Sequence, residues 1–234
     1  MKILVLNPNT SEIVTNKIAN VIKTIARPET EVIVKSVDHG PESLESFYDE
    51  AMAVPYIMQA VKSAHEEKFD AIIIAAFCDP GIEAAKEISL IPVFGSEECT
   101  FAVSLLFGNK FGIITEKKHK EAVKAREVRK HGLESRFAGV RALDMGVVEI
   151  ALNPKKAKER GIAVARQLID DGAEVIIMGC ASMAGYSDEI KQELGIPVID
   201  PTIATFKLVE GIVETGLSQS KIGLYATPTP QKMN

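Results

Sequence analysis

The sequence predicts an α/β fold made of two similar Rossmann-like lobes, each a mainly parallel sheet flanked by helices. Short aliphatic runs alternate with longer amphipathic runs along the 234 residues, which is typical of parallel strands covered by helices. The second half also repeats the order of the first. We therefore expect the lobes to be related by a pseudo-two-fold axis, with the functional site between them.

The first half contains four strands and four helices in alternation. Short runs rich in aliphatic residues predict the strands, and a 3.6-residue apolar period predicts the helices. In order, they span residues 2–7, 11–26, 31–37, 48–67, 69–77, 81–89, 91–95 and 97–107. Pro55 lies within the second helix and predicts a break or kink there, because proline removes a backbone hydrogen bond.

The second half repeats that order. Its strands and helices alternate over residues 110–115, 118–132, 139–146, 154–172, 173–179, 187–195, 196–200 and 202–216. Gly132 and Gly172 predict where two of these helices end, since glycine readily adopts the left-handed conformation found at helix C-termini. The chain after residue 216 has no clear period.

The two halves align at a nearly constant offset. Lys2–Asn7 aligns with Lys110–Thr115, Cys78 aligns with Cys180, and each half has an "IPV" run at the corresponding place. The identities are few, but strand order and cysteine position agree. The aliphatic runs before the two cysteines show no alternation, as expected of parallel strands buried on both faces.

The composition excludes several classes of protein. The net charge is −5 and no block of basic residues is present, so nucleic acid is not expected as a partner. No apolar run reaches the roughly 18 residues of a membrane span, and the N-terminal segment is too short and too polar for a signal peptide. We expect a cytoplasmic protein that binds a small molecule and keeps Cys78, Cys99 and Cys180 as free thiols.

Cys78 and Cys180 are the candidate catalytic residues. Each lies just past the C-terminal end of a predicted parallel strand, where open α/β sheets bind ligands, so facing lobes would bring both thiols to one cleft. A thiolate on one side can remove a proton from carbon while a thiol on the other side donates one, which inverts that carbon without a cofactor. A single free cysteine is usually a buried apolar residue, but recurrence at equivalent positions favours catalysis.

Other residues near the strand ends are candidates for ligand binding. Asn7 and Asn9 in "NPNTS" either donate hydrogen bonds to a ligand or close the turn, and Thr115 occupies the position equivalent to Asn7. Ala181 and Ser182 belong to a run of small residues whose backbone N–H groups can hold an enolate oxygen.

The residues beside the first cysteine are also expected to line the site. They are Phe77 and Asp79, and Asp79 is further predicted to cap the following helix, with Pro80 as that helix's first residue. Cys99 lies inside a predicted helix, has no counterpart in the other half and is assigned no role.

The remaining motifs indicate neither a metal nor a phosphate site. The four histidines show no metal-ligand spacing, and no glycine-rich phosphate loop is present. No Lys or Arg falls within the motifs expected to line the cleft, so no basic residue is expected there to pair with a substrate carboxylate.

Five motifs of the chain resemble those of the hydantoin racemases of the aspartate/glutamate racemase superfamily. They are "NPNTS", "AFCDPG", "GCASMA", "IPVIDP" and, near the C-terminus, "SKIGLYATP". The resemblance covers nearly the whole chain. It implies cofactor-independent racemisation, with Cys78 and Cys180 as the acid/base pair. It also implies that the last helix and tail return to the first lobe, so that residues 1–98 plus 205–234 form lobe 1 and residues 99–204 form lobe 2. We further expect a homo-oligomer.

The residues after the cysteines bear on the substrate. Amino-acid racemases of the superfamily typically have Asn-Thr after the first cysteine and Thr-Glu after the second, whereas this chain has "DPG" and "ASM", and Glu116 stands where a hydroxyl residue is expected. These differences favour a neutral ring, either a 5-monosubstituted hydantoin or allantoin. An aspartate- or glutamate-type racemase is the alternative. A non-catalytic small-ligand-binding protein is a second one, which the duplicated thiols disfavour because binding needs no pair of titratable groups.

Overall fold

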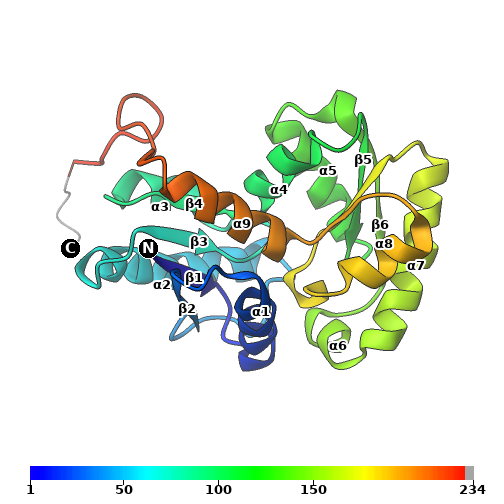
Figure 1. Ribbon diagram of the computed structural model, residues 1–234, viewed down its shortest axis with the longest axis horizontal. Coiled ribbons are helices and arrows are strands. Elements are labelled where there is room, and N and C mark those ends of the chain that lie inside the picture. Colours follow the sequence, from blue (N-terminus) through cyan, green and yellow to red (C-terminus); the bar gives the residue numbers. More distant parts are fainter. Residues whose placement is uncertain (230–234) are drawn as a thin grey trace.

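The computed structural model describes residues 1–229 and has two four-stranded parallel sheets with helices on their faces (Figure 1). The strand order is β2-β1-β3-β4 in the first sheet and β6-β5-β7-β8 in the second, so corresponding strands occupy corresponding places. The strands are β1 (Lys2–Asn7), β2 (Glu31–Ser36), β3 (Ala71–Ile74), β4 (Val93–Gly95), β5 (Phe111–Thr115), β6 (Phe137–Ala142), β7 (Val175–Met178) and β8 (Val198–Ile199). The predicted two-lobed α/β fold class is confirmed.

Helices connect the parallel strands and cover the sheets (Figure 1). The α-helices are α1 (Glu12–Ile25), α2 (Phe47–Glu66), α3 (Ile82–Ile88), α4 (Ser96–Ser104), α5 (Lys120–Lys130), α6 (Val147–Leu152), α7 (Pro154–Asp170), α8 (Ser187–Leu194) and α9 (Pro201–Val213). Every helix predicted from the sequence is present. The helix α6 and two 3-10 turns, Glu134–Arg136 and Ala181–Met183, were not predicted, because segments this short do not display a helical period.

The predicted break at Pro55 is not observed, since α2 runs without interruption from Phe47 to Glu66. Proline costs a helix a backbone hydrogen bond. The helix is retained because Ala53, Ile57 and Val61 form a buried stripe that packs with the apolar face of the first sheet. The free energy gained by burying this stripe therefore outweighs the loss of one backbone hydrogen bond at Pro55.

The two strands that lead to the cysteines are buried on both faces, as predicted. All four residues of β3 and all four of β7 are buried. In the first sheet β3 lies between β1 and β4, with Ile72 paired to both Leu4 and Val93, and β7 lies between β5 and β8 in the same way. Burial of apolar area is the main driving force of folding, so these strands firmly hold the loops that follow them at the carboxyl edge of each sheet.

The helix α9 and the segment after it lie on the first lobe (Figure 1). α9 packs against α4, α1 and the first sheet, and beyond it the Gln219 amide both accepts from the N–H of Val93 (2.9 Å) and donates to its carbonyl (3.0 Å). The predicted lobe boundaries after residues 98 and 204 fall inside α4 and α9. The division into lobes stays a prediction, and its residues 230–234 lie outside the described part of the chain.

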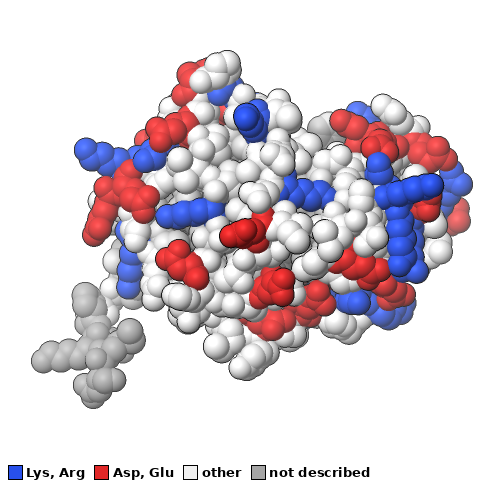
Figure 2. Space-filling model, turned by 90° about the horizontal axis from the view of Figure 1, so that it is seen from below, with Lys and Arg blue, Asp and Glu red and all other residues white. Residues whose placement is uncertain are grey.

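The surface carries charges of both signs. In the view of Figure 2, Lys and Arg are interspersed with Asp and Glu, and uncharged surface lies between them. Across residues 1–229, no helix is both long enough and apolar enough to cross a membrane.

Candidate active site between the two lobes

The loop after β3 brings Cys78 to the carboxyl edge of the first sheet. The backbone turns tightly there, because the N–H of Asp79 donates to the carbonyl of Ala76 (3.1 Å) and Asp79 has a φ of 42°. The Asp79 carboxylate accepts hydrogen bonds from the backbone N–H groups of Glu97 (2.8 Å) and Glu98 (2.9 Å) at the start of α4. This pair of bonds anchors the Cys78 loop to α4.

The prediction that Asp79 caps the helix that follows it is wrong. That helix, α3, begins at Ile82 and has no side-chain cap on its N-cap residue, Gly81. Asp79 instead caps α4, whose own N-cap residue is Gly95, and a Cβ atom on Gly95 would overlap the Asp79 carboxylate. The tertiary contact prevails because the first turn of α4 offers two N–H groups that have no partner within the helix.

The loop after β7 brings Cys180 to the carboxyl edge of the second sheet. The N–H of Gly179 donates to the carbonyl of Ile114 (2.7 Å), and a Cβ on Gly179 would lie 2.7 Å from that oxygen, so only glycine fits. The Cys180 thiol lies 2.9 Å from the hydroxyl of Ser182, and the Ser182 carbonyl accepts from the Lys17 ammonium (2.6 Å). A residue of α1 in the first lobe thus holds the loop that carries Cys180.

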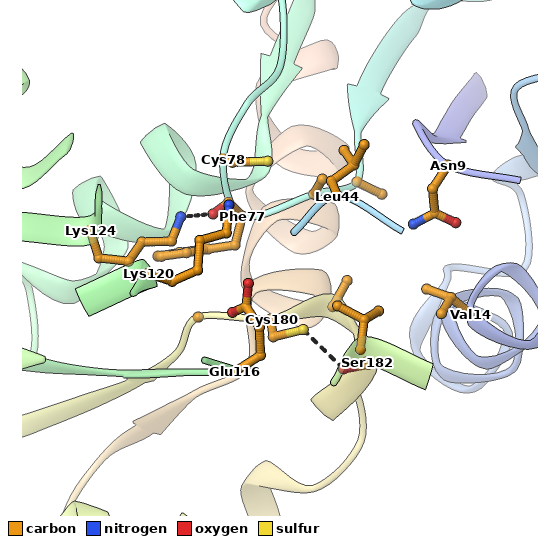
Figure 3. Close-up of a pocket in the computed structure, with 15 residues that line it drawn as sticks. Asn9, Val14, Leu44, Phe77, Cys78, Glu116, Lys120, Lys124, Cys180 and Ser182 are labelled. Carbon is orange, nitrogen blue, oxygen red and sulfur yellow. Dashed lines mark hydrogen bonds between the residues drawn. The ribbon is translucent and has the colours of Figure 1, made fainter. Parts of the chain in front are cut away.

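Cys78 and Cys180 line the same cavity, which has a volume of about 460 Å³ including its open mouth. Figure 3 shows the two thiols reaching it from opposite lobes. The first lobe contributes Asn9, Val14, Leu44, Ala75, Ala76, Phe77 and Cys78, and the second contributes Glu116, Lys120, Lys124, Val147, Gly179, Cys180, Ala181 and Ser182. The structure therefore brings together six of the predicted site residues: Asn9, Phe77, Cys78, Cys180, Ala181 and Ser182.

Three predicted site residues, Asn7, Asp79 and Thr115, do not line this cavity. Asn7 is fully buried, and its amide donates to the Oδ1 atom of Asn9 (2.9 Å). The same Oδ1 atom accepts from the N–H of Ser11 (2.9 Å), which leaves the NH₂ group of Asn9 for the cavity. Asn7 and Asp79 support residues that line the site, and Thr115 does the same through its hydroxyl, which donates to the Glu116 carboxylate (2.7 Å).

The expectation of a cleft without basic residues is wrong, because Lys120 and Lys124 line it. Lys124 is 1% exposed and donates to the carboxylate of Glu97 (2.6 Å) and to the carbonyl of Phe77. Lys120 donates to the carboxylate of Glu50 (3.0 Å). Their spacing of four places both side chains on one face of α5. This spacing is the one feature of the sequence that could have indicated two lysines in the cleft. It was not recognised because the segment around it is strongly polar, as in a helix exposed to solvent.

Burial raises the pKa of both cavity thiols above the ordinary value. For Cys180 the value reaches about 12, with the Glu116 carboxylate adding to the effect of burial and hydrogen bonds from Ser182 opposing it. For Cys78 burial is again the largest cause, and the carboxylate of Glu50 adds to it while Lys124 and Lys120 oppose it. Both groups are therefore thiols at neutral pH, and the two lysines favour the thiolate at Cys78.

The third cysteine lies apart from this site. Cys99 is buried within α4 and does not line the cavity, and its burial raises the pKa of its thiol. Among residues 1–229 no group of three or more His, Cys, Asp or Glu side chains is arranged to hold a metal ion.

Comparison with known proteins gives close matches over the whole chain. The family model described as Asp/Glu/Hydantoin racemase matches residues 3–209. A hydantoin racemase of Pseudomonas sp. (strain NS671) is 36% identical, over 97% of this chain and 92% of that protein. The structure of an allantoin racemase from Pseudomonas fluorescens has a TM-score of 0.95 and 34% identity, with both chains covered completely. That of the allantoin racemase from Klebsiella pneumoniae has a TM-score of 0.92 and 31% identity, over 100% of this chain and 96% of that one.

Proposed function

The chain belongs to the Asp/Glu/Hydantoin racemase family and is a racemase, and we propose that it inverts the C5 stereocentre of 5-monosubstituted hydantoins or of allantoin. One observation carries the proposal: thiols from the two lobes, Cys78 and Cys180, line one cavity from opposite sides (Figure 3). The similarity to hydantoin and allantoin racemases over nearly the whole chain supports the substrate class.

The proposed reaction is a two-base proton transfer. One cysteine, as the thiolate, takes the proton from C5, and the electron pair of the broken C–H bond moves onto the neighbouring carbonyl oxygen to give an enolate. The other cysteine, as the thiol, then donates its proton to the opposite face of C5, which restores the carbonyl and leaves that sulfur as the thiolate. The two cysteines exchange roles in the reverse direction, so each face of the ring requires its own sulfur.

Donors already present in the cavity wall suit the enolate oxygen. The Lys124 ammonium has three N–H groups and two acceptors in the described structure, Glu97 and the Phe77 carbonyl, so one N–H remains for a ligand. The NH₂ group of Asn9 also faces the cavity. Preorganised donors of this kind stabilise developing negative charge more than water does, and we propose that they replace a cofactor in this enzyme.

The charges of the wall favour a ring without net charge over an amino acid. Aspartate or glutamate would bring a carboxylate that must be paired when it is buried. Lys120 and Lys124 already pair with Glu50 and Glu97, and Glu116 adds a further carboxylate to the wall. A hydantoin presents only N–H and C=O groups. Its C=O groups can accept from the NH₂ group of Asn9 and the remaining N–H of Lys124, and its N–H groups can donate to acceptors of the wall.

The acid/base pair is tested by substitution with serine. Cys78→Ser and Cys180→Ser should each reduce racemisation at least about 10³-fold, since a serine hydroxyl is too weak an acid and base near neutral pH and such a group contributes about 10²–10⁴-fold. Cys99→Ser is the matched control and should keep wild-type activity. Polarimetry measures racemisation, and circular dichroism verifies the fold. Wild-type rates in either of the first two variants would refute the two-base mechanism.

The substrate class is tested with a panel of compounds. Deuterium incorporation at C5 or Cα is followed by NMR for 5-alkyl and 5-aryl hydantoins, allantoin, aspartate and glutamate. We expect exchange with at least one hydantoin or with allantoin, unchanged after dialysis against a chelator. Faster exchange of aspartate or glutamate would instead favour the amino-acid racemase alternative.

We further propose that the enzyme is cytoplasmic and homo-oligomeric. Cell fractionation tests the location, and light scattering of the purified protein tests the oligomeric state.

A further inference from the structure

Glu116 is a buried carboxylate whose bonding is incomplete. The residue is 4% exposed and lines the cavity between the two cysteines. Among residues 1–229 its side chain makes one hydrogen bond, in which the Thr115 hydroxyl donates to Oε2 (2.7 Å), and it makes no ion pair. Buried carboxylates are normally paired or accept several hydrogen bonds, so an acceptor oxygen of Glu116 is left for a ligand.

The other carboxylates around the cavity are already engaged. Glu97 pairs with Lys124 and Glu50 with Lys120, and the Asp79 carboxylate accepts two backbone N–H groups of α4. Figure 3 shows the Glu116 carboxylate directed toward the space between the sulfurs of Cys78 and Cys180. Glu116 is therefore the acidic group of the wall that faces the cavity.

We propose that Glu116 recognises the substrate by accepting a hydrogen bond from a ring N–H group. This inference rests on the proposed function, because it places a cyclic amide or imide in the cavity. A neutral N–H donor fits better than a cation, since a cation would also meet the ammonium groups of Lys120 and Lys124. A substrate carboxylate fits worst, because it would face the carboxylate of Glu116 directly.

The contact acts on binding rather than on the proton transfer. The ring N–H is present both before and after C5 loses its proton, so its hydrogen bond stabilises the bound substrate and the transition state alike. Loss of the contact should therefore raise KM far more than it lowers kcat. A purely structural role for Glu116 would instead lower kcat and thermal stability together.

Binding is measured by titration calorimetry with 5,5-dimethylhydantoin, which has both ring N–H groups but no hydrogen at C5. Glu116→Gln should bind it about 10-fold more weakly than the wild type, the loss expected for one hydrogen bond to a charged group. In the wild type, methylation of one of the two ring nitrogens should cause a similar loss, and in the variant the same methylation should cause little further loss. Glu121→Gln is the matched control, since Glu121 accepts from the N–H of Ala142 (3.0 Å) outside the cavity.

The outcomes separate this inference from the proposed function. Three results would each overturn the role of Glu116. The wild type and Glu116→Gln could bind the ring equally well, N-methylation could weaken binding to the variant as much as to the wild type, or the wild type could fail to bind the ring. Turnover of hydantoins by a wild type whose binding does not depend on Glu116 would leave the proposed function standing. Binding that depends on Glu116 without any turnover would instead support the inference and refute the racemase activity on hydantoins.

Discussion

At the scale of single residues, the protonation of the two cavity sulfurs controls the chemistry that we propose. Burial raises the pKa of Cys180 to about 12 and that of Cys78 above its ordinary range. A two-base mechanism needs one thiol and one thiolate, so one proton must leave the pair before turnover. The groups that set this balance are Glu116, which disfavours the thiolate at Cys180, and Lys120 and Lys124, which favour it at Cys78.

The raised pKa values predict that activity increases with pH. A group whose pKa lies above the working range is mostly protonated, and its basic form becomes more abundant by up to about tenfold per pH unit. We expect kcat/KM for a hydantoin to rise from pH 7 to pH 8, and to rise less steeply above pH 8, where Lys17 loses its charge. Initial rates in a series of buffers at constant ionic strength provide the measurement. A maximum below pH 7 would contradict it.

At the scale of elements, the start of α4 determines where Cys78 stands. The N-cap residue Gly95 has no side chain to accept the free N–H groups of α4, so the Asp79 carboxylate accepts them. The carboxylate fits there because Gly95 has no Cβ atom to overlap it. Burial, with the neighbouring Glu97 adding to it, raises the pKa of the Asp79 carboxyl. The two residues connect the loop after β3 with a helix almost twenty residues further along the chain.

Removal of this cap should cost both stability and activity. Asp79→Ala is expected to lower the free energy of unfolding by about 1–2 kcal/mol and to reduce kcat, because the loop of Cys78 loses its anchor on α4. Asp79→Asn keeps one acceptor oxygen and should lose less of both. Urea denaturation and racemisation assays provide the measurements.

The matched control is Ser46→Ala, which removes the cap of α2, where the Ser46 hydroxyl accepts from the N–H of Asp49 (3.1 Å). It should lower stability by a similar amount and leave kcat unchanged, since Ser46 does not line the cavity. If Asp79→Ala lost stability alone, the anchoring role would be refuted.

At the scale of the whole molecule, the cavity exists only because the two lobes are held together. Lys17 in α1 of the first lobe bridges them: its ammonium donates to the Ser182 carbonyl (2.6 Å) and lies 3.6 Å from the centre of the Tyr186 ring. Burial lowers the pKa of Lys17 to about 8, with Cys180 and Asp200 opposing that effect. The bridge thus loses its charge as the pH rises through about 8.

Lys17→Met should weaken this bridge while keeping most of the apolar stem. We expect a loss of about 1 kcal/mol in the free energy of unfolding and a lower kcat at pH 7, because the loop of Cys180 loses a contact. The activity gap to the wild type should narrow above pH 8, where the wild-type side chain becomes neutral. Lys23→Met is the control, since Lys23 lies on the exposed face of the same helix. A gap that widened above pH 8 would contradict the role of the charge.

The amino-acid sequence by itself determined the fold class, the repeated halves and the two cysteines as the candidate pair. These depend on local period and on the recurrence of strand, turn and cysteine, which neighbouring residues encode. The helix containing Pro55 was predicted, but not its continuity through the proline, because that continuity depends on packing against the sheet. The helix α6 was not predicted because it is short.

Only the tertiary structure decided which charged groups surround the sulfurs. Lys124 meets Glu97 across 27 residues of chain, Lys120 meets Glu50 across 70, and Lys17 meets the Ser182 carbonyl across 165. In the sequence these lysines belong to predicted helices, and even the spacing of four between Lys120 and Lys124 does not distinguish a buried pair from a solvated one. The physical reason is that a charged side chain loses its water only where distant segments close over it and supply a partner. For the same reason Asp79 caps α4 rather than the helix beside it, and Asn7 supports Asn9 rather than lining the cavity itself.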